Sequence, residues 1–465
     1  MTDCSEGFAD SAAVRKPGAD RTQTLAVVTA ATMLVLIIFT VPLTTLEPTA
    51  LALAAGAGAQ AWILSAMPLG AAIGLLAGGA LGDNHGRRRV FLGGLLVMTL
   101  GSALGALSPH AAVLIVARVV QGLGGAAVLA CGLGLIGIAY PEPRARTRAT
   151  GIWAAGLGAG VATGPIIAVL LTMAGGWTGA YWGSAALAAC LLAIGRGALP
   201  AAAARPEKSV DWAGTILLMA GLGLALTSLT EARLGLVRPG VIVPAIGGIA
   251  LLIAFVLVER RHANPVLDLS LFRSADFVGA TVAAFASGAG ILALMSLVPF
   301  VLTHAMGTSA LSAAFALTAW SATSVVTALG ARWLPEAWSR SILAASLGAA
   351  TVAQLALLGA RPDGGIASFL PGLFLAGAAN GVLNASLGRQ AVATVPPEHA
   401  AMGSGANNTA RYLGSAIGIT VGAVLMAHGA DIGGLEGLLA GWDEAVLITA
   451  GFSIAGAIIV ACVRD

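Results

Sequence analysis

Long apolar runs with almost no charge dominate this sequence and restrict the folds open to it. Each run is close to the roughly 20 residues that an α-helix needs to cross the hydrocarbon core of a bilayer. Of the 465 residues, 58% are hydrophobic and 10% are charged, whereas soluble domains contain roughly 45–50% apolar residues. A soluble domain of this composition would expose large apolar patches, so the sequence predicts a membrane-spanning protein.

Charged residues, glycines and prolines bound fourteen such runs. The predicted spans are 25–46, 61–81, 91–108, 112–138, 148–173, 177–195, 212–231, 240–258, 277–303, 308–331, 342–360, 366–387, 401–427 and 445–463. The runs are continuous and lack the alternation of polar and apolar residues that is typical of membrane β-strands. We therefore predict an all-α polytopic membrane protein, whose 63 glycines allow helix backbones to approach closely.

The basic residues predict the orientation of these spans, because Lys and Arg accumulate in cytoplasmic loops. With a cytoplasmic N-terminus, 19 of the 24 Lys and Arg residues lie in cytoplasmic segments and three in outer loops. The other two, Arg118 and Arg411, lie within spans. We therefore expect both termini on the cytoplasmic side, with residues 1–24 forming a polar cytoplasmic tail.

The densest group of charges, in the stretch GALGDNHGRRRVF, falls in the predicted cytoplasmic loop between the second and third spans. Gly79, Asp83, Gly86, Arg87 and Arg88 follow the spacing G-x-x-x-D-x-x-G-R-R, which resembles the loop signature of the major facilitator superfamily. A loop that only fixes topology would explain the arginines but not the glycines and the acid. The resemblance implies a loop that takes part in conformational switching.

Two further motifs follow in the order that this superfamily has. Arg118, Gln121 and Gly122 in the fourth span resemble its R-x-x-Q-G pattern. The G-x-x-x-G-P core of its antiporter motif is matched in the fifth span by Gly160, Gly164 and Pro165. The Gly-Gly that closes this motif is replaced by Ala168 and Val169. After the eighth span, VERRHANPVLDLSLFRSADFVGA is similar to a loop of the fourteen-helix drug:proton antiporter branch.

The resemblance covers about residue 25 to the end and implies the domain organisation. Two six-helix halves, residues 25–195 and 261–465, would flank an inserted helix pair at 196–260. Transporters of this kind work by alternating access, with the substrate near the membrane midplane where the halves meet.

The chain departs from this branch at the residue associated with proton coupling. Members usually carry an Asp in the first span, nine residues before a Pro; with Pro48 as that proline, this chain has Phe39. Glu47 lies at the outer end of the same span. We hypothesise that Glu47 replaces the missing Asp and pairs with Arg118 when it is ionised. The alternative is a solvated carboxylate at a helix end.

Several polar or aromatic side chains within spans are candidates for lining a substrate cavity. They are Trp153, Gln354, Asn380, Asn384, Asn407 and Arg411. A charge within a span requires a polar partner or water, and a tryptophan can stack on a ligand. Amides at this depth also serve as hydrogen bonds between helices, and that alternative stays open here.

The predicted function is the export of small amphipathic compounds, such as drugs, antibiotics or metabolites, by proton antiport across the bacterial cytoplasmic membrane. The alternative is uptake or facilitated transport of a specific small solute. The sequence has no G-x-x-x-x-G-K-[ST] loop for ATP, and no residue cluster that predicts an enzyme, a metal site or a cofactor. Dispersed basic residues exclude nucleic-acid binding. We expect a monomer whose partners are the substrate, protons and the lipid bilayer.

Overall fold

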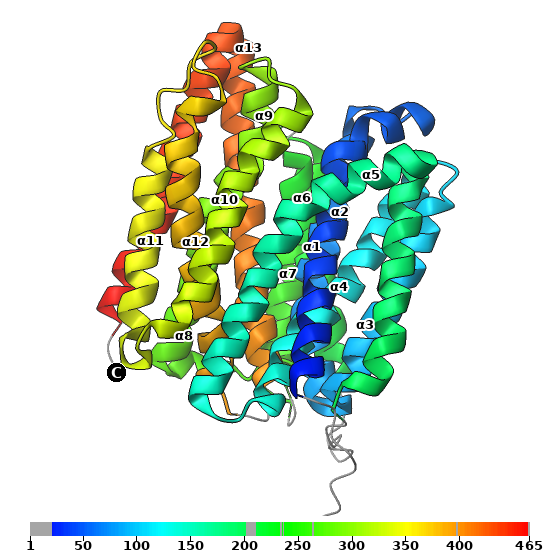
Figure 1. Ribbon diagram of the computed structural model, residues 1–465, viewed down its shortest axis with the longest axis vertical. Coiled ribbons are helices and arrows are strands. Elements are labelled where there is room, and N and C mark those ends of the chain that lie inside the picture. The colour runs from blue at the N-terminus through cyan, green and yellow to red at the C-terminus, as the bar shows by residue number, and fades with distance from the viewer. Residues whose placement is uncertain are drawn as a thin grey trace, which may run out of the picture.

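The computed structural model describes residues 21–200, 211–232, 235, 237–262, 265–396 and 399–463, and their regular secondary structure is entirely helical (Figure 1). The α-helices are α1 (Arg21–Ala52), α2 (Ala57–His85), α3 (Arg87–Ala106), α4 (Ala111–Ala139), α5 (Pro143–Ala198), α6 (Trp212–Glu231), α7 (Pro239–Glu259), α8 (Ala275–Ser287), α9 (Ala293–His304), α10 (Ala310–Gly330), α11 (Ser339–Leu355), α12 (Leu370–Ala393) and α13 (Ala400–Cys462). The all-α prediction is confirmed. Most of the predicted N-terminal tail, residues 1–20, lies outside the described residues, as do residues 201–210 of the predicted inserted pair.

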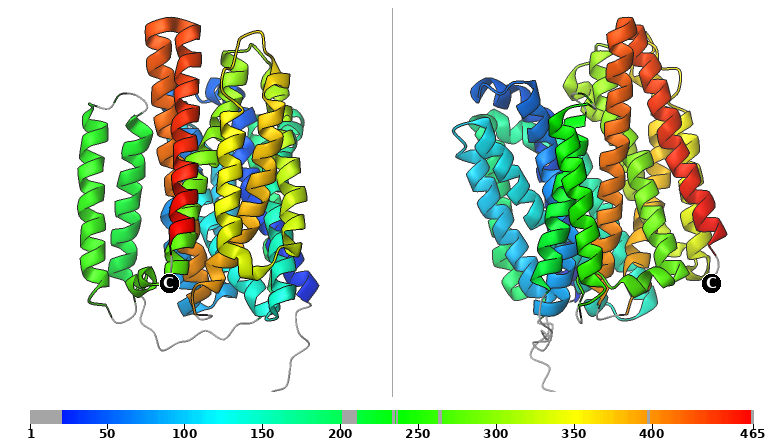
Figure 2. Two further views of the ribbon diagram at one scale, coloured as in Figure 1. Left: turned by 90° about the vertical axis from the view of Figure 1, so that its left-hand side faces the viewer. Right: turned by 180° about the vertical axis from the view of Figure 1, so that it is seen from behind.

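The two longest helices, α5 and α13, each contain a glycine pair at which the chain reverses direction. Gly176 has a φ of 65° and Gly434 a φ of 57°, a left-handed conformation that glycine adopts without steric cost. Close to the reversal of α13, a Cβ on Gly429 would collide with the backbone of Gly437. These glycines, which have no Cβ, therefore let the helical segments before and after the reversal of α13 pack against each other (Figure 2). The spans predicted from the sequence left residues 428–444 as a loop, whereas most of them are helical in the structure.

Eleven helical segments of the described chain are long and apolar enough to cross a membrane. One of them consists of α8, the π-helical turn η3 (Gly288–Leu292) and α9 in series. In this count α5 and α13 each appear once, although each contains a reversal, and α11, with 17 residues, is not included. The chain is thus a multi-pass helical membrane protein.

The helices form two groups on either side of a central interface. Helices α1–α5 form the N-terminal group and α8–α13 the C-terminal group, on the right and left of Figure 1. The groups meet where α2 packs on α13 and α5 packs on α10. A Cβ on Gly405 of α13 would lie only 2.6 Å from the carbonyl oxygen of Leu75 on α2. Glycine therefore permits this close approach between the groups.

Helices α6 and α7 stand together at one edge of the bundle (Figure 2). Trp62 Nε1 donates to Glu231 Oε1 at 2.7 Å, which ties α6 to α2. Thr420 Oγ1 donates to the carbonyl oxygen of Leu229 at 3.0 Å, which ties α6 to α13. Helix α7 exposes a row of large apolar side chains, including Ile246. The pair thus contacts both groups through α6 and presents α7 to lipid.

Candidate functional site

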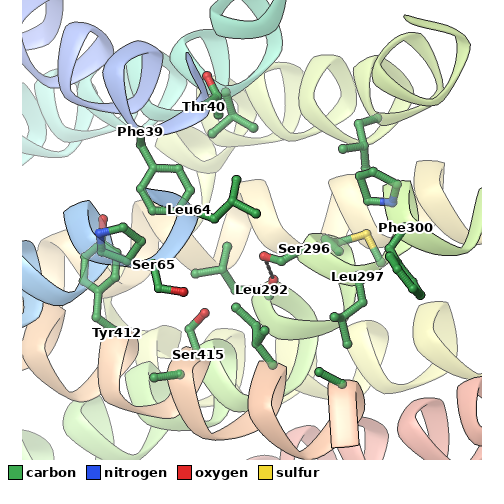
Figure 3. Close-up of a pocket in the computed structure, with 18 of the residues that line it drawn as sticks. Phe39, Thr40, Leu64, Ser65, Leu292, Ser296, Leu297, Phe300, Tyr412 and Ser415 are labelled. Atoms are coloured by element: carbon green, nitrogen blue, oxygen red, sulfur yellow. Dashed lines mark hydrogen bonds between the residues drawn. The ribbon is translucent and has the colours of Figure 1, made fainter. Parts of the chain in front are cut away.

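A cavity of about 480 Å³ lies between the two groups. Small-molecule sites have volumes of about 300–1,000 Å³. Helices α1, α2, α5 and α6 contribute to its wall, as do η3, α9, α10, α12 and α13. Figure 3 shows Phe39 and Thr40 of α1 on one wall and Tyr412 and Ser415 of α13 on the opposite wall. The cavity can therefore hold a small molecule in contact with both groups.

Arg411 is the only charged residue among the described residues that line this cavity. Its Nη1 donates to Asn384 Oδ1 at 2.9 Å, and its Nη2 donates to Asn408 Oδ1 at 2.8 Å. Asn380, one turn before Asn384, also lines the cavity and donates to Ser324 Oγ at 3.1 Å. Asn380, Asn384 and Arg411, three of the six predicted cavity residues, thus lie together on its wall.

Close packing between α13 and the π-helical turn η3 fixes the position of Arg411. A Cβ on Gly288 would collide with the carbonyl oxygen of Arg411. On α13, a Cβ on Gly414 would lie 2.3 Å from the carbonyl oxygen of Phe285, and one on Gly418 would lie 2.3 Å from that of Ala289. Small residues at four-residue spacing allow such close helix contacts in membranes. The backbone that carries Arg411 is therefore held by direct helix contact.

Arg118 lies behind the α1 wall of the cavity and is fully buried. Its Nη1 donates to the carbonyl oxygen of Ile38 at 2.7 Å, and its Nη2 donates to that of Phe39 at 3.2 Å. Pro42 follows Ile38 by four residues in α1 and has no N–H to donate to that carbonyl. Arg118 thus satisfies a backbone acceptor that the proline leaves free, and it holds the segment of α1 that carries Phe39.

Gln121 completes this arrangement. Its Oε1 accepts from Arg118 Nη1 at 2.9 Å, and its Nε2 donates to Ser102 Oγ at 2.9 Å. The R-x-x-Q pair therefore connects α4 to α1 and α3.

The predicted ion pair between Glu47 and Arg118 is not formed in this structure. Glu47 is exposed near the end of α1, whereas Arg118 binds carbonyl groups at positions 38 and 39 of the same helix. Eight residues of helix correspond to roughly 12 Å at 1.5 Å per residue. Direct contact would require a different arrangement of α1 and α4.

The other three predicted cavity residues lie elsewhere. Trp153 is buried and donates from Nε1 to Thr32 Oγ1 at 3.0 Å, which links α5 to α1. Asn407 donates to the carbonyl oxygen of Ala280 at 3.1 Å, which links α13 to α8. Gln354 is fully buried on α11, and its amide has no hydrogen-bond partner among the described residues. None of the three is among the described residues of the wall.

The wall also contains residues that the sequence analysis did not assign to it. Thr230 belongs to α6, so the inserted pair contributes to the cavity itself. Tyr412 follows Arg411, and its ring centroid lies 5.6 Å from the guanidinium carbon. Phe39 was singled out only as the position of a missing Asp, and it proves to face the cavity. An aromatic residue next to an intramembrane arginine was the available signal for Tyr412; for Thr230 there was none.

At the end of the molecule opposite the α13 reversal, Asp83 joins the two groups. Its carboxylate accepts the N–H of Met402 at 2.8 Å and that of Ala401 at 3.3 Å, both in the first turn of α13. Arg87 Nε donates to the same carboxylate at 2.9 Å. N–H groups in a first helical turn lack intrahelical partners, and the helix dipole favours a negative charge there. A Cβ on Gly79 would lie 2.4 Å from the carbonyl oxygen of Ala401, so glycine is required for this contact.

The sequence predicted a loop here, but in the structure Asp83 lies in α2, Arg87 and Arg88 lie in α3, and Gly86 alone separates the two helices. Gly86 has a φ of 96°, a conformation that favours glycine. Arg87 Nη1 donates to the carbonyl oxygen of Gly134 on α4 at 3.3 Å. Arg88 donates to the carbonyl oxygen of Arg196 at the end of α5. The loop signature therefore positions Asp83 by fixing the turn against α4 and α5.

The glycines of the α4 and α5 motifs lie at close helix contacts. A Cβ on Gly122 would lie 2.2 Å from the carbonyl oxygen of Met67 on α2, and one on Gly160 would lie 2.5 Å from that of Met33 on α1. A Cβ on Gly164, next to Pro165, would lie 2.0 Å from Thr40 Oγ1. Gly122 thus allows α4 to pack closely on α2, and Gly160 and Gly164 allow α5 to pack closely on α1.

Comparisons with known proteins agree with this architecture. The sequence profile of the Major Facilitator Superfamily matches residues 25–419. The chain is 30% identical to the multidrug resistance protein Stp of Mycobacterium tuberculosis over 80% of this chain and 70% of that protein. It is 28% identical to the puromycin resistance protein pur8 of Streptomyces alboniger over 97% and 92% of the two chains. It is 30% identical to the cephamycin export protein CmcT of Amycolatopsis lactamdurans over 77% and 76%.

A solved structure has the same fold. The crystal structure of the human organic anion transporter MFSD10 (TETRAN) superposes with a TM-score of 0.67 over 94% of this chain and 100% of that chain, at 18% identity. The family, the export protein of A. lactamdurans and the human transporter point to a transporter rather than an enzyme. With its two helix groups, its interfacial cavity and the profile match over most of its length, this chain belongs to the Major Facilitator Superfamily.

Proposed function

We propose that this protein exports small amphipathic compounds from the cytoplasm by alternating access, in exchange for protons. The observation that carries the proposal is the largely apolar cavity of about 480 Å³ between two helix groups. At one end these groups are joined by the contact of Asp83 with the first turn of α13. Separating the groups at that end and closing them at the other would move the contents of the cavity across the membrane.

The proposed topology has fourteen membrane crossings with both termini in the cytoplasm. Dividing α5 and α13 at their glycine pairs and counting α11 raises the eleven apolar segments to fourteen crossings. The excess of basic residues in one set of loops supports the orientation. In this proposal residues 1–24 are a cytoplasmic tail, 25–195 and 261–465 are two six-helix halves, and 196–260 carry the inserted pair. The protein acts as a monomer in the bacterial cytoplasmic membrane.

In the proposed orientation, we interpret this conformation as a state closed toward the cytoplasm. Asp83 and Gly79 lie at the closed end, and the cavity extends toward Leu438, beside the reversal of α13. Loss of the contact between Asp83 and the α13 N-terminus would then accompany opening to the cytoplasm. The loop signature would thus control the conformational equilibrium.

Proton coupling is proposed to use Glu47 and Arg118. Glu47 would accept a proton at the outer end of α1, where it is exposed in this state. Arg118 donates hydrogen bonds to the backbone of α1 at Ile38 and Phe39, and Phe39 lines the cavity. A movement of α1 that follows protonation of Glu47 would therefore change the cavity wall. Ion pairing between the two side chains would belong to another state of the cycle.

The names of the relatives support export. The M. tuberculosis and S. alboniger proteins are named for drug resistance, and the A. lactamdurans protein for export. Uptake or facilitated transport of one solute is the second candidate. It is favoured by Ala168 and Val169, which replace the Gly-Gly that closes the antiporter motif.

Inside-out membrane vesicles test the proposal. Vesicles with the protein, and matched vesicles without it, are given puromycin or a fluorescent amphipathic dye, with and without an imposed proton gradient. Export predicts protein-dependent accumulation that requires the gradient and disappears with an uncoupler. Equilibration to equal concentrations, unaffected by the uncoupler, would establish facilitated transport instead.

A further inference from the structure

We propose that the cavity selects amphipathic compounds that carry one acidic group, and that Arg411 binds this group. The inference rests on the proposed transport function and names the class of substrate. It starts from the charges on the cavity wall. Arg411 is the single cation there, and none of the other described lining residues is acidic. The wall therefore offers an uncompensated positive charge to its contents.

The hydrogen-bond partners of Arg411 do not neutralise it. Its guanidinium donates to two neutral amides, those of Asn384 and Asn408. None of the ion pairs formed by the described residues includes Arg411. The residue is only 8% exposed, and its Nε has no partner among the described residues. A buried charge without a counter-charge is costly, and removing one partner of a buried ion pair is strongly destabilising. An anion in the cavity would supply the missing partner.

The guanidinium is held in place before a ligand arrives. Two amide oxygens fix its orientation, and the close contact of Gly288 with α13 fixes its backbone. Groups held in the bound geometry lose less entropy on binding, which favours affinity. Arginine also presents a planar fork of N–H groups that matches the two oxygens of a carboxylate. The structure thus resembles a preformed site for a carboxylate or sulfonate.

The surroundings of Arg411 suit the rest of such a molecule. Ser415 lies one turn beyond Arg411 on α13, and its hydroxyl group is directed into the cavity (Figure 3). Phe39, Leu292 and Phe300 form apolar surface of the same cavity, with Phe300 on the side away from Tyr412 (Figure 3). An acidic head near Arg411 and an apolar or aromatic body beyond it would satisfy both regions. A cationic head would meet a like charge with no acid to offset it.

A matched set of three pyrene compounds tests head-group selection on the unmodified protein. They are 4-(1-pyrenyl)butyrate, 4-(1-pyrenyl)butanol and 4-(1-pyrenyl)butyltrimethylammonium, which share one apolar body. Binding to the full-length protein in lipid nanodiscs is measured against empty nanodiscs, which corrects for partition into lipid. We expect the carboxylate to bind at least about tenfold more tightly than either of the others, which corresponds to about 1.4 kcal/mol. Equal or tighter binding of the ammonium compound, or no binding of the carboxylate, overturns the inference.

Two substitutions test whether Arg411 is the residue that selects the acidic head group. Arg411→Gln should weaken binding of the carboxylate about tenfold and leave the alcohol within about twofold. Arg411→Lys keeps the charge and should keep most of the preference for the carboxylate compound. It provides the test if the Gln variant does not fold. Arg340→Gln is the matched control, because Arg340 pairs with Asp276 outside the cavity. An equal loss for all three compounds in both Arg411 variants would reduce Arg411 to a structural role and refute the inference.

The vesicle assay, repeated with the three pyrene compounds, separates this inference from the proposed function. Gradient-driven export that shows no preference for acids would leave the function standing and refute the selection by Arg411. Arg411-dependent binding of the carboxylate, without gradient-driven export of any compound, would support the site and refute the proposed export.

Discussion

Replacing Asp83 with Asn should shift the protein from the conformation closed at the Asp83 end toward the open one. Asn keeps the shape of the side chain but removes the charge that faces the first turn of α13. Asp83 accepts two backbone N–H groups from that turn, those of Met402 and Ala401. Hydrogen bonds to charged groups contribute about 1.5–3 kcal/mol and neutral ones about 0.5–1.5 kcal/mol.

The two N–H groups bond to different carboxylate oxygens, and an Asn amide has one acceptor oxygen, so one bond becomes neutral and the other is lost. The neutral bond is weaker by about 1 kcal/mol, the lost bond costs about 1.5–3 kcal/mol, and the helix dipole adds about 0.3–1 kcal/mol. The closed conformation should therefore lose about 3–5 kcal/mol relative to the open one, a factor of about 150–4,000 in their ratio. Arg87 lies in the same group as Asp83, so the loss of their ion pair affects both conformations and largely cancels. The change is large enough to make the open conformation visible in a distance distribution.

Double electron–electron resonance measures this distribution. Spin labels are placed at Arg89 in the N-terminal group and at Trp338 in the C-terminal group, both exposed. The labelled variants are made in a protein whose native cysteines other than Cys131 are replaced; Cys131 can stay because it is buried. Asp276→Asn is the matched control, because Asp276 pairs with Arg340 at 2.9 Å within the C-terminal group. A longer distance component should appear with Asp83→Asn and not with the control. An unchanged distribution for Asp83→Asn would refute the reasoning.

Three further predictions follow from the described contacts. Gly122→Ala should destabilise the folded protein by about 1–3 kcal/mol and so lower its thermal unfolding midpoint in detergent. The reason is that the Cβ of the alanine would lie 2.2 Å from the carbonyl oxygen of Met67. Gly137 on the same helix has open space where a Cβ would lie, so Gly137→Ala should not lower the midpoint. Equal midpoints for the two variants would show that the predicted clash at Gly122 does not occur. Glu47→Gln should abolish substrate-induced proton release while substrate still binds, and unchanged release would remove Glu47 from the coupling mechanism. In the background that keeps Cys131 alone of the native cysteines, Arg144→Cys should react with an impermeant thiol reagent only in inside-out vesicles. Reaction in intact cells would reverse the proposed orientation.

Prediction from sequence was strongest where a local pattern has a direct physical cause. Continuous apolar runs can satisfy their backbone groups in lipid only as helices, so the helical membrane class followed from the sequence. The loop signature also marked Asp83, Gly79 and Gly86, whose roles depend on charge, on the absence of a Cβ and on a positive φ. It did not indicate that the partner of Asp83 is the backbone of Met402, 319 residues away, because every non-proline residue carries the same N–H group.

The cavity was harder to predict for a related reason. In lipid both the outer and the inner faces of a helix are apolar, so periodicity does not reveal which face lines a cavity. Asn384 and Asn407 therefore looked equivalent in the sequence, although Asn384 lines the cavity and Asn407 binds the backbone of α8.

The sequence by itself determined that the chain crosses a membrane as helices and where glycine, proline and charge interrupt or mark them. Only the tertiary structure decided which helices meet and how each is rotated about its axis. The carbonyl of Ile38 becomes a partner of Arg118 because Pro42 leaves it without a helical donor and because α4 packs beside it. The position of Pro42 can be read from the sequence, whereas the packing of α4 beside α1 depends on contacts throughout the helix bundle.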